Sequence, residues 1–473
     1  MAKQIVYLIF VFLFIGQAKA DTLTVIYGTN LAYVNQVVEL NSYKDLITKT
    51  VQIIAQDTVD SLGNFKFSFE LENTQLVQVQ LGIYNAIMYV EPKKTYQVAF
   101  PEYKPKTKAD ILNPYFKPVE IYLGIVNRDT LELNYLITDF NEQYHRFIDQ
   151  HYYAVIKNPR GEMVDSLINN IENTFGKINN EFFQNYRLYK YAWLKYISVM
   201  RDYRYIVREY FNDQELLYQN PAYMDLFNQI FTNYLSFYMT KKEGERIFSD
   251  IAFAKSPKYV KESFSNNLVL LNDTLQELVL LKGLQDAFYT KDFPIPSLLI
   301  TLDSIANYSN IKYHCELAKS IRTKVLKAKV GFDAPQFLLY DADSVLRKNK
   351  DYLSNYVYLN FISIESYSCQ EELVVLKQVY EKHTNDFKVV TISIDNDFNR
   401  VVKYFNDKEY HWILLDGSAN EKLITDFKVR AYPSYCLINP EGKIEMSPAP
   451  SPSENFEWYF FTLLQGKKSN RHR

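Results

Sequence analysis

The period of the apolar residues changes along this chain, and each change limits what the neighbouring segment can fold into. Between residues 21 and 112 apolar and polar residues alternate, as in Phe65, Phe67 and Phe69 with lysine and serine between them. A period of two is typical of strands with one buried face, so we predict a small β-sandwich here. Between residues 113 and 327 apolar residues recur every three or four positions, which predicts an all-α segment of amphipathic helices.

The last segment, residues 328–467, combines both patterns. Short apolar runs at residues 356–363 and 387–395 alternate with an amphipathic stretch at 369–383. Strands that alternate with helices predict an α/β sheet of mixed strand direction. We therefore expect an α+β multidomain protein with an N-terminal β-sandwich, a central helical segment and a C-terminal α/β domain, followed by a basic tail at residues 468–473.

Residues 1–20 have the three parts of a secretory signal peptide. Lys3 precedes the apolar run 5–15, and Ala18 and Ala20 form a small-x-small cleavage site. The apolar run is too short to cross a bilayer core of about 30 Å as a helix. We therefore expect an exported protein of the periplasm or cell envelope, with no transmembrane span once the leader is removed.

Charge and composition exclude several classes of function. The 53 Lys and Arg nearly cancel the 55 Asp and Glu, so the chain lacks the basic surface with which nucleic-acid-binding proteins neutralise phosphates. The 6 histidines form no ligand spacing, so we expect no metal, and we expect no other cofactor. The odd number of cysteines leaves at least one thiol unpaired. We expect Cys315 and Cys436 in the core, while a disulfide between Cys369 and Cys436 stays open.

Aromatic residues recur in the helical segment, and two interpretations fit them. They could form an aromatic platform for a sugar or a peptide, or a tyrosine-rich core whose hydroxyls reach the rim. We favour the core, because tyrosine combines a large apolar ring with one polar atom. The residues concerned are Tyr186, Tyr189, Tyr191, Trp193, Tyr196, Tyr203, Tyr205 and Tyr210.

Three motifs in the last segment carry a specific resemblance. The first is VGFDAPQF at 330–337, and the second is NF at 360–361 with CQEEL at 369–373. The third is VRAYPS at 429–434, followed by NPEGK at 439–443. In this order they resemble the entry motif, active-site turn and cis-proline loop of TlpA-like and AhpC/TSA-type thioredoxin-fold proteins. The resemblance implies a thioredoxin-like fold, with N-terminal extensions like those of exported Bacteroidetes thioredoxin-like proteins.

The resemblance does not extend to the reactive pair of cysteines. Active relatives carry C-x-x-C, and the aligned tetrapeptide here is Ser366-Tyr367-Ser368-Cys369, so serine replaces the first cysteine. A serine hydroxyl is far less acidic than a thiol, and it can neither attack a disulfide nor close one. Glu365 stands where the resemblance implies a tryptophan. We therefore predict a degenerate site without ordinary dithiol exchange.

Glu372 follows Cys369 by three residues, which places both on one face of the predicted helix. The resemblance implies that a carboxylate here tunes the cysteine pair, which would make Glu372 a base beside Cys369. The alternative is a solvated carboxylate in the first turn, where it is favourable to the helix dipole. If the site is redox-active, the catalytic residues are Cys369, Ser366 and Glu372.

A peroxiredoxin-like chemistry is a second interpretation of the same residues. Peroxiredoxins use [T/S]-x-x-C, which Ser366 and Cys369 match. The proline implied four residues earlier is Ile362 here, and the implied arginine aligns with Pro433, which leaves Arg430 as the nearest substitute. The alternative function is therefore a thiol oxidoreductase or peroxidase that uses the single Cys369.

The loop at Pro433 keeps the pattern of the family. The resemblance implies a cis proline whose neighbouring backbone pairs with an extended partner segment. Such strand-like addition gains affinity from main-chain hydrogen bonds and needs no thiol. We therefore predict that the chain binds a protein or peptide partner in the cell envelope, with Pro433, Tyr432, Arg430 and Tyr367 at the contact. A further possibility places the main binding function in the sandwich or in the tyrosine-rich helices.

Overall fold

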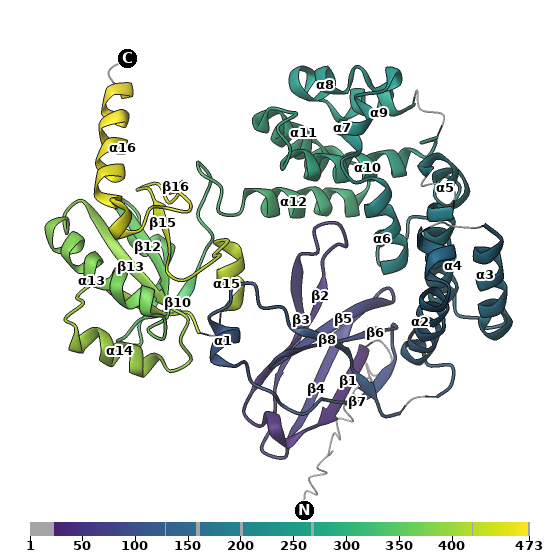
Figure 1. Cartoon of the computed structure of the whole chain (residues 1–473), viewed down its shortest axis with the longest axis horizontal. Helices are drawn as coiled ribbons and strands as arrows, with labels where there is room; N and C mark the ends of the chain where they lie inside the picture. Colours follow the sequence, from purple (N-terminus) through teal and green to yellow (C-terminus); the bar gives the residue numbers. More distant parts are fainter. Residues whose placement is uncertain are drawn as a thin grey trace, which may run out of the picture.

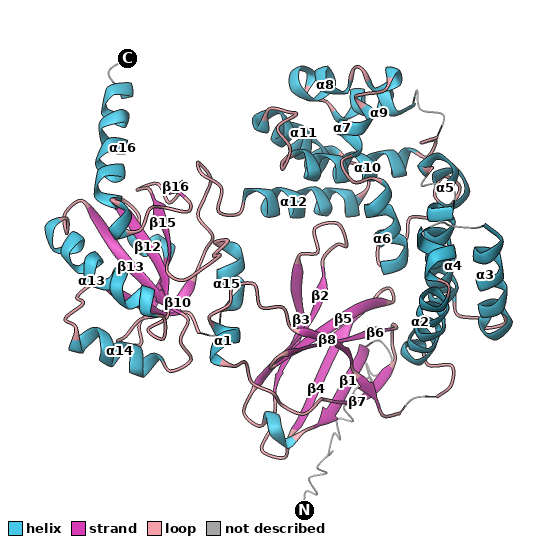
Figure 2. Ribbon diagram, in the orientation of Figure 1, coloured by secondary structure: helices cyan, strands magenta, loops and turns pink. Residues whose placement is uncertain are grey.

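The computed structural model describes residues 23–127, 129–157, 161–198, 202–265, 269–418 and 420–471. The predicted signal peptide, residues 1–20, lies outside them. The expected fold class is confirmed, with sheets first, helices in the middle and an α/β domain last (Figures 1 and 2). Within the described ranges, no helix is long and apolar enough to cross a membrane.

The N-terminal part consists of two sheets that enclose one core. In strand β4 the alternating Phe65, Phe67 and Phe69 are buried, which is the expected period of two. The strand orders are β4-β1-β7-β9 and β3-β2-β5-β6-β8. The strands are β1 (Leu23–Thr29), β2 (Val37–Tyr43), β3 (Val51–Thr58), β4 (Asn64–Glu70), β5 (Gln75–Leu81), β6 (Tyr84–Val90), β7 (Thr95–Ala99), β8 (Val119–Tyr122) and β9 (Gly124–Ile125).

Two of these strands extend the sheets beyond residue 112, where we had expected helices to begin. Strand β8 pairs with β6 and strand β9 pairs with β7. They are four and two residues long, which is too short for alternation to show in the sequence. The loop that leads to these two strands contains the short helix α1 (Lys108–Ile111). A capping box formed by Thr107 and Asp110 stabilises the start of this helix.

The central part is helical, as expected, and its stripes face one core. In helix α3 the residues Val164, Leu167, Ile171 and Phe175 are all buried. The helices are α2 (Leu133–Gln150), α3 (Gly161–Phe175), α4 (Glu181–Ser198), α5 (Tyr203–Tyr210), α6 (Pro221–Ile230), α7 (Tyr234–Tyr238), α8 (Ile247–Ser249), α9 (Pro257–Ser265), α10 (Asp273–Ala287), α11 (Ile295–Tyr308) and α12 (Lys312–Leu326).

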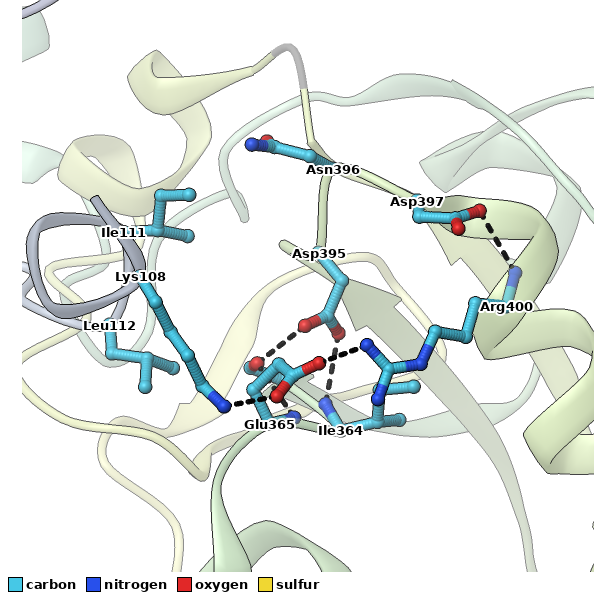
Figure 3. Close-up of a pocket in the computed structure, with 10 residues that line it drawn as sticks. Lys108, Ile111, Leu112, Ile364, Glu365, Asp395, Asn396, Asp397 and Arg400 are labelled. Carbon is cyan, nitrogen blue, oxygen red and sulfur yellow. Dashed lines mark hydrogen bonds and ion pairs between the residues drawn. The ribbon is translucent and has the colours of Figure 1, made fainter. Parts of the chain in front are cut away.

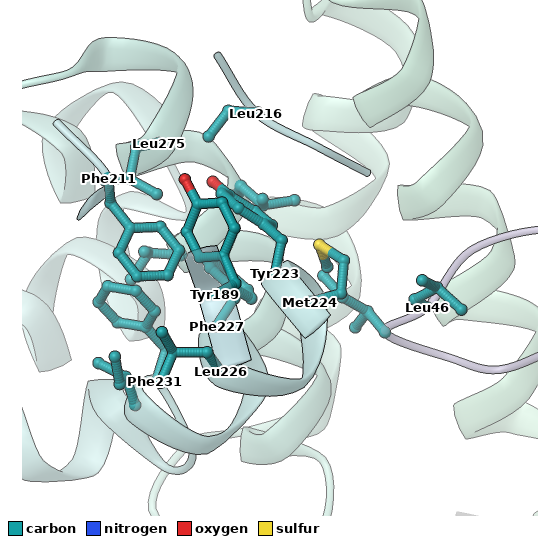
Figure 4. Close-up of a cluster of buried hydrophobic side chains, with 14 of the residues drawn as sticks. Leu46, Tyr189, Phe211, Leu216, Tyr223, Met224, Leu226, Phe227, Phe231 and Leu275 are labelled. Carbon is teal, nitrogen blue, oxygen red and sulfur yellow. The ribbon is translucent and has the colours of Figure 1, made fainter. Parts of the chain in front are cut away.

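The tyrosines of α4 belong to this core. The ring of Tyr189 lies 4.6 Å from that of Tyr223 and 5.8 Å from that of Phe211, centroid to centroid (Figure 4). The hydroxyl of Tyr189 donates to the carbonyl of Tyr210 at 2.8 Å. Tyr189 therefore buries its ring and satisfies its hydroxyl, as the core interpretation predicted.

The C-terminal α/β domain is built on a five-stranded sheet with the order β14-β13-β12-β15-β16. Strand β12 is parallel to β13 and antiparallel to β15, so strand direction is mixed, as expected. Its elements are β10 (Leu338–Tyr340), β11 (Leu346–Lys348), β12 (Tyr356–Ile362), α13 (Tyr367–Lys382), β13 (Phe387–Ser393), α14 (Phe398–Asp407), β14 (Ile413–Asp416), α15 (Glu421–Asp426), β15 (Ser434–Ile438), β16 (Ile444–Met446) and α16 (Phe456–Arg471).

Polar contacts join the three parts. The side-chain amide of Asn134 in α2 bonds both backbone groups of Tyr89 in β6, at 2.6 and 2.8 Å. Lys327, directly after α12, pairs with Asp426 of α15 at 2.5 Å. Lys108 of α1 pairs with Glu365, which directly precedes the first turn of α13. In Figure 1, α1 accordingly lies beside the α/β domain although its chain neighbours belong to the sheets.

Candidate functional site

The turn between β12 and α13 carries the serine and cysteine that the sequence singles out. Ser366 is the N-cap residue of α13 with extended backbone, and its hydroxyl oxygen lies 3.1 Å from that of Ser368. The same hydroxyl hydrogen-bonds the Cys369 thiol. The turn therefore brings Ser366 and Cys369 together.

Cys369 is fully buried, with 0% of its surface exposed. It belongs to an apolar cluster with Ile362, Ile364 and Leu373. Burial raises the pKa of the Cys369 thiol, and this outweighs the opposing bonds from the backbone of Ser363 and the hydroxyl of Ser366. The thiol is therefore held protonated and away from solvent.

The loop before β15 lies beside this turn because β15 pairs antiparallel with β12, with Ser434 opposite Phe361. The Tyr432–Pro433 peptide bond is cis, as the family resemblance implied. The hydroxyl of Ser368 donates to the carbonyl of Tyr432 at 3.4 Å, which links the turn to the loop.

The four predicted contact residues differ in exposure. Tyr367 is 73% exposed, and Arg430 is exposed. Pro433 is half-buried, and half-buried Tyr432 packs against the apolar clusters on both faces of the sheet. Tyr367 and Arg430 therefore present their side chains to solvent, whereas the side chain of Tyr432 is held against the sheet.

Glu372 has a role that neither expectation described. Its carboxylate accepts hydrogen bonds from the backbone and the hydroxyl of Ser453, the backbone bond measuring 3.2 Å. It thereby fastens the 3-10 turn Pro452–Glu454 to helix α13. The charge of Glu372 adds to the causes that raise the pKa of Cys369, which is the opposite of activating the thiol.

Sequence reasoning missed an ion cluster on the other side of the turn. The Glu365 carboxylate accepts from the ammonium of Lys108 and from the guanidinium of Arg400 in α14, and we call these three residues the clasp (Figure 3). The hydrogen bond from Lys108 is the largest cause that holds the pKa of Glu365 below its ordinary value. Lys108 lies 257 positions from Glu365, so no local pattern could reveal this contact.

Buried Asp395 supports the same turn. Its carboxylate accepts from the Ser363 hydroxyl at 2.5 Å, the Ser393 hydroxyl at 2.8 Å and the Ile364 backbone at 2.9 Å. These donors satisfy a buried charge and fix the backbone that leads into α13. A cavity of about 250 Å³ lies between this turn and α1.

Of the two other cysteines, both expected in the core, Cys436 lies there, whereas Cys315 is only half-buried. Cys436 is buried, and burial raises its pKa to about 12. Half-buried Cys315 donates its thiol to the carbonyl of Ser309 at 3.3 Å. All three thiols are free, so the disulfide left open between Cys369 and Cys436 is not formed. In the part of the chain that the structure describes, no His, Cys, Asp and Glu residues cluster as a metal site.

Comparison with known proteins agrees with this architecture. Residues 354–444 match the family described as thioredoxin-like. The C-terminal region is a thioredoxin-like domain. The thiol-disulfide oxidoreductase ResA of Bacillus thuringiensis subsp. konkukian is 26% identical over 125 residues, which cover 26% of this chain and 70% of that protein. The ResA of Bacillus anthracis is 26% identical over 135 residues, covering 28% and 78%.

Solved structures of this fold resemble the same domain. A thiol:disulfide interchange protein from Bacteroides sp. is 19% identical and covers 28% of this chain and 89% of its own, with a TM-score of 0.26. A thiol-disulfide oxidoreductase from Bacteroides fragilis is 17% identical and covers 27% and 98%, with a TM-score of 0.25. The matches cover about a quarter of the chain.

The burial of Cys369 predicts slow alkylation in the folded protein. Because burial both raises the pKa of the thiol and keeps the reagent from the sulfur, we expect Cys369 to react at least about tenfold more slowly near pH 8 than in the unfolded chain. Mass spectrometry after timed iodoacetamide labelling measures each cysteine separately, with half-buried Cys315 as the internal control. Fast labelling of Cys369 in the folded state, with an apparent pKa below about 8.5, would contradict the account.

The clasp predicts a pH dependence for α1. Since the folded pKa of Glu365 is lowered, the clasp stabilises the docked α1 above the ordinary carboxyl pKa, and this contribution is lost as the pH falls through the folded value. We expect the methyl NMR signals of Ile111 and Leu112 to shift as the solution is acidified below about pH 4. In Glu365→Gln that titration should be absent. An identical titration in this variant would show that another group holds α1.

Proposed function

We propose that this chain is an exported TlpA-like protein whose thioredoxin-like domain binds an extended segment of a protein partner at the Pro433 loop, without dithiol exchange. One observation carries the proposal. Cys369 is buried with a raised pKa, and the position of the attacking cysteine is Ser366.

The chemistry of exchange explains why this observation matters. Disulfide exchange needs a thiolate that attacks one sulfur and a second thiol that resolves the mixed disulfide. Ser366 cannot become a nucleophile comparable to a thiolate, because its hydroxyl is far less acidic. The names of the Bacillus relatives describe thiol-disulfide oxidoreductases, and this chain shares their fold in one domain. We infer that it retains their mode of partner recognition and has lost the transfer of electrons.

Binding of a partner segment at the Pro433 loop needs only the backbone of the loop and the exposed side chains beside it. The antiparallel pairing of β15 with β12 presents the backbone before Ser434 at the end of the sheet beside α13. A partner segment that adds there gains affinity from main-chain hydrogen bonds, and neighbouring side chains supply specificity. Exposed Tyr367 and exposed Arg430 are suited to that second role, because an aromatic ring and a guanidinium dominate many interfaces.

Single-cysteine chemistry has one observation in its favour. The Ser366 hydroxyl bonds the Cys369 thiol at the start of a helix, which lowers a thiol pKa and matches the short peroxiredoxin pattern. The net direction is nevertheless upward, because burial is the largest cause. A peroxidase also needs solvent access to its sulfur, and Cys369 has none. Binding therefore remains the function that the geometry supports best.

Peptide selection tests the proposal. A display library of random peptides of about ten residues is selected on the chain from residue 21 onward, and selected peptides are measured by fluorescence anisotropy. We expect Cys369→Ala to bind as tightly as the unchanged chain. Tyr367→Ala and Arg430→Ala should each weaken binding about tenfold, because each removes an exposed contact without opening the core.

Tyr308→Ala is the matched control, because Tyr308 is an 81% exposed tyrosine of helix α11 in another part of the molecule. It should leave the affinity unchanged. Loss of binding in Cys369→Ala would contradict the proposal and favour chemistry at the thiol. Equal affinity in Tyr367→Ala, Arg430→Ala and Tyr308→Ala would move the binding site away from the Pro433 loop.

A further inference from the structure

The cavity between α1 and the turn after β12 has an apolar wall built from two distant parts of the chain. Ile111 and Leu112 come from α1 and the residue after it, and Ile364 comes from the turn (Figure 3). All three residues line the cavity, and polar residues flank both the Ile111–Leu112 pair and Ile364 in the chain. The cavity exists only because α1 docks on the α/β domain, so the thioredoxin-like domain alone lacks half of the wall.

The buried carboxylate that lines the cavity needs no hydrogen bond from a ligand. Asp395 is its buried charge, and the bonds from Ser363, Ser393 and Ile364 already satisfy it. An apolar group entering the cavity would therefore gain contact with the wall without leaving a buried polar atom unpaired.

The rim of the cavity carries two cations, Lys108 and Arg400, beside the carboxylates of Glu365 and Asp397, and both cations keep N–H groups available for a further hydrogen bond. Glu365 takes one N–H group from Lys108 and one from Arg400. An ammonium carries three donors and a guanidinium five, so both cations can bond a second carboxylate while keeping the first. Their side chains are more than half exposed, which leaves these donors within reach of a ligand.

The cavity and the Pro433 loop flank the end of the same strand. Ser434 pairs with Phe361 on one side of β12, and Ser393 pairs with Ile362 on the other. The residues that follow, Ser363 and Asp395, line the cavity. Because neighbouring strands lie about 4.8 Å apart, the loop and the cavity are separated by roughly 10 Å. An extended peptide covers that distance with about three residues.

We propose that this cavity is the side-chain pocket of the partner site, taking one apolar side chain of the extended segment that binds the Pro433 loop, with an acidic residue of that segment at the rim. The inference rests on the function proposed above. It assigns α1, which belongs to the N-terminal part, to the recognition of the partner. The partner chemistry is an apolar residue next to a carboxylate, about three residues from the stretch that pairs with the loop.

The volume suits such an occupant. An engineered cavity of about 150 Å³ binds benzene, so one of 250 Å³ has room for a leucine or phenylalanine side chain. Burying a side chain of that size contributes roughly 1.5–3 kcal/mol, which corresponds to a loss of at least about tenfold in affinity when it is removed.

A double-mutant cycle between peptide and protein tests the pocket. The probe is a peptide selected from the random library, in unchanged form and with its apolar anchor replaced by glycine. For the unchanged protein the glycine peptide should bind at least about tenfold more weakly. For Leu112→Gln the same replacement should cost less than about threefold, because the pocket no longer favours an apolar group. Tyr115→Ala, a 63% exposed position on the same segment, should behave as the unchanged protein does.

A second measurement uses the unchanged protein, so its result does not depend on whether Leu112→Gln keeps α1 docked. In the unchanged protein the methyl signals of Ile111, Leu112 and Ile364 should shift on addition of the anchored peptide and stay in place with the glycine peptide. Replacing the acidic residue of the peptide by lysine should weaken binding, more strongly at low salt.

The outcomes separate the two proposals. Selected peptides that depend on Tyr367 and Arg430 but share no apolar anchor, or whose anchor effect is equal in the unchanged protein and Leu112→Gln, overturn the pocket and leave the binding function standing. A library that yields no peptide dependent on Tyr367 or Arg430 overturns both.

Discussion

The pairing of strand β12 on both of its edges is the constraint on which the site depends. β13 is parallel to it on one edge and β15 antiparallel on the other, so the end of β13 and the start of β15 meet at the carboxyl end of β12. This arrangement brings together, at one end of the sheet, the turn into α13, Asp395 and the Pro433 loop. Because β12 is buried on both faces, its register is held by apolar contacts above and below the sheet.

The same arrangement explains why we expect the Cys369 thiol to be unreactive. In the first turn of α13 a residue faces either the solvent at the loop or the core below the helix. Tyr367 faces solvent and Cys369 faces the core. The helix N-terminus favours a thiolate, but removal from water disfavours it more, as the direction of the pKa shift records. The proposed recognition and the reactivity of the thiol are thus separable, because the loop backbone does not depend on the protonation of the sulfur.

Local patterns revealed much of this structure from the sequence. The alternation of Phe65, Phe67 and Phe69 and the stripe of α3 each act within one element, so their periods predicted the fold class. The family resemblance of the motif around Pro433 implied the cis proline. Strands β8 and β9 were not predicted because four and two residues are too few for alternation to show. The contact of Glu365 with Lys108 was not predicted because it joins two residues that lie 257 positions apart in the chain. The bond of Glu372 to Ser453 depends in the same way on tertiary placement.

The central claim is that the domain recognises a partner without exchanging disulfides, and turnover measures this most directly. The rate at which dithiothreitol reduces insulin is compared for the unchanged chain, Ser366→Cys and Cys369→Ala. We predict that the unchanged chain and Cys369→Ala match the rate without protein, whereas Ser366→Cys, which restores a second thiol at the helix start, accelerates it about tenfold or more. Catalysis by the unchanged chain that disappears in Cys369→Ala would contradict the account.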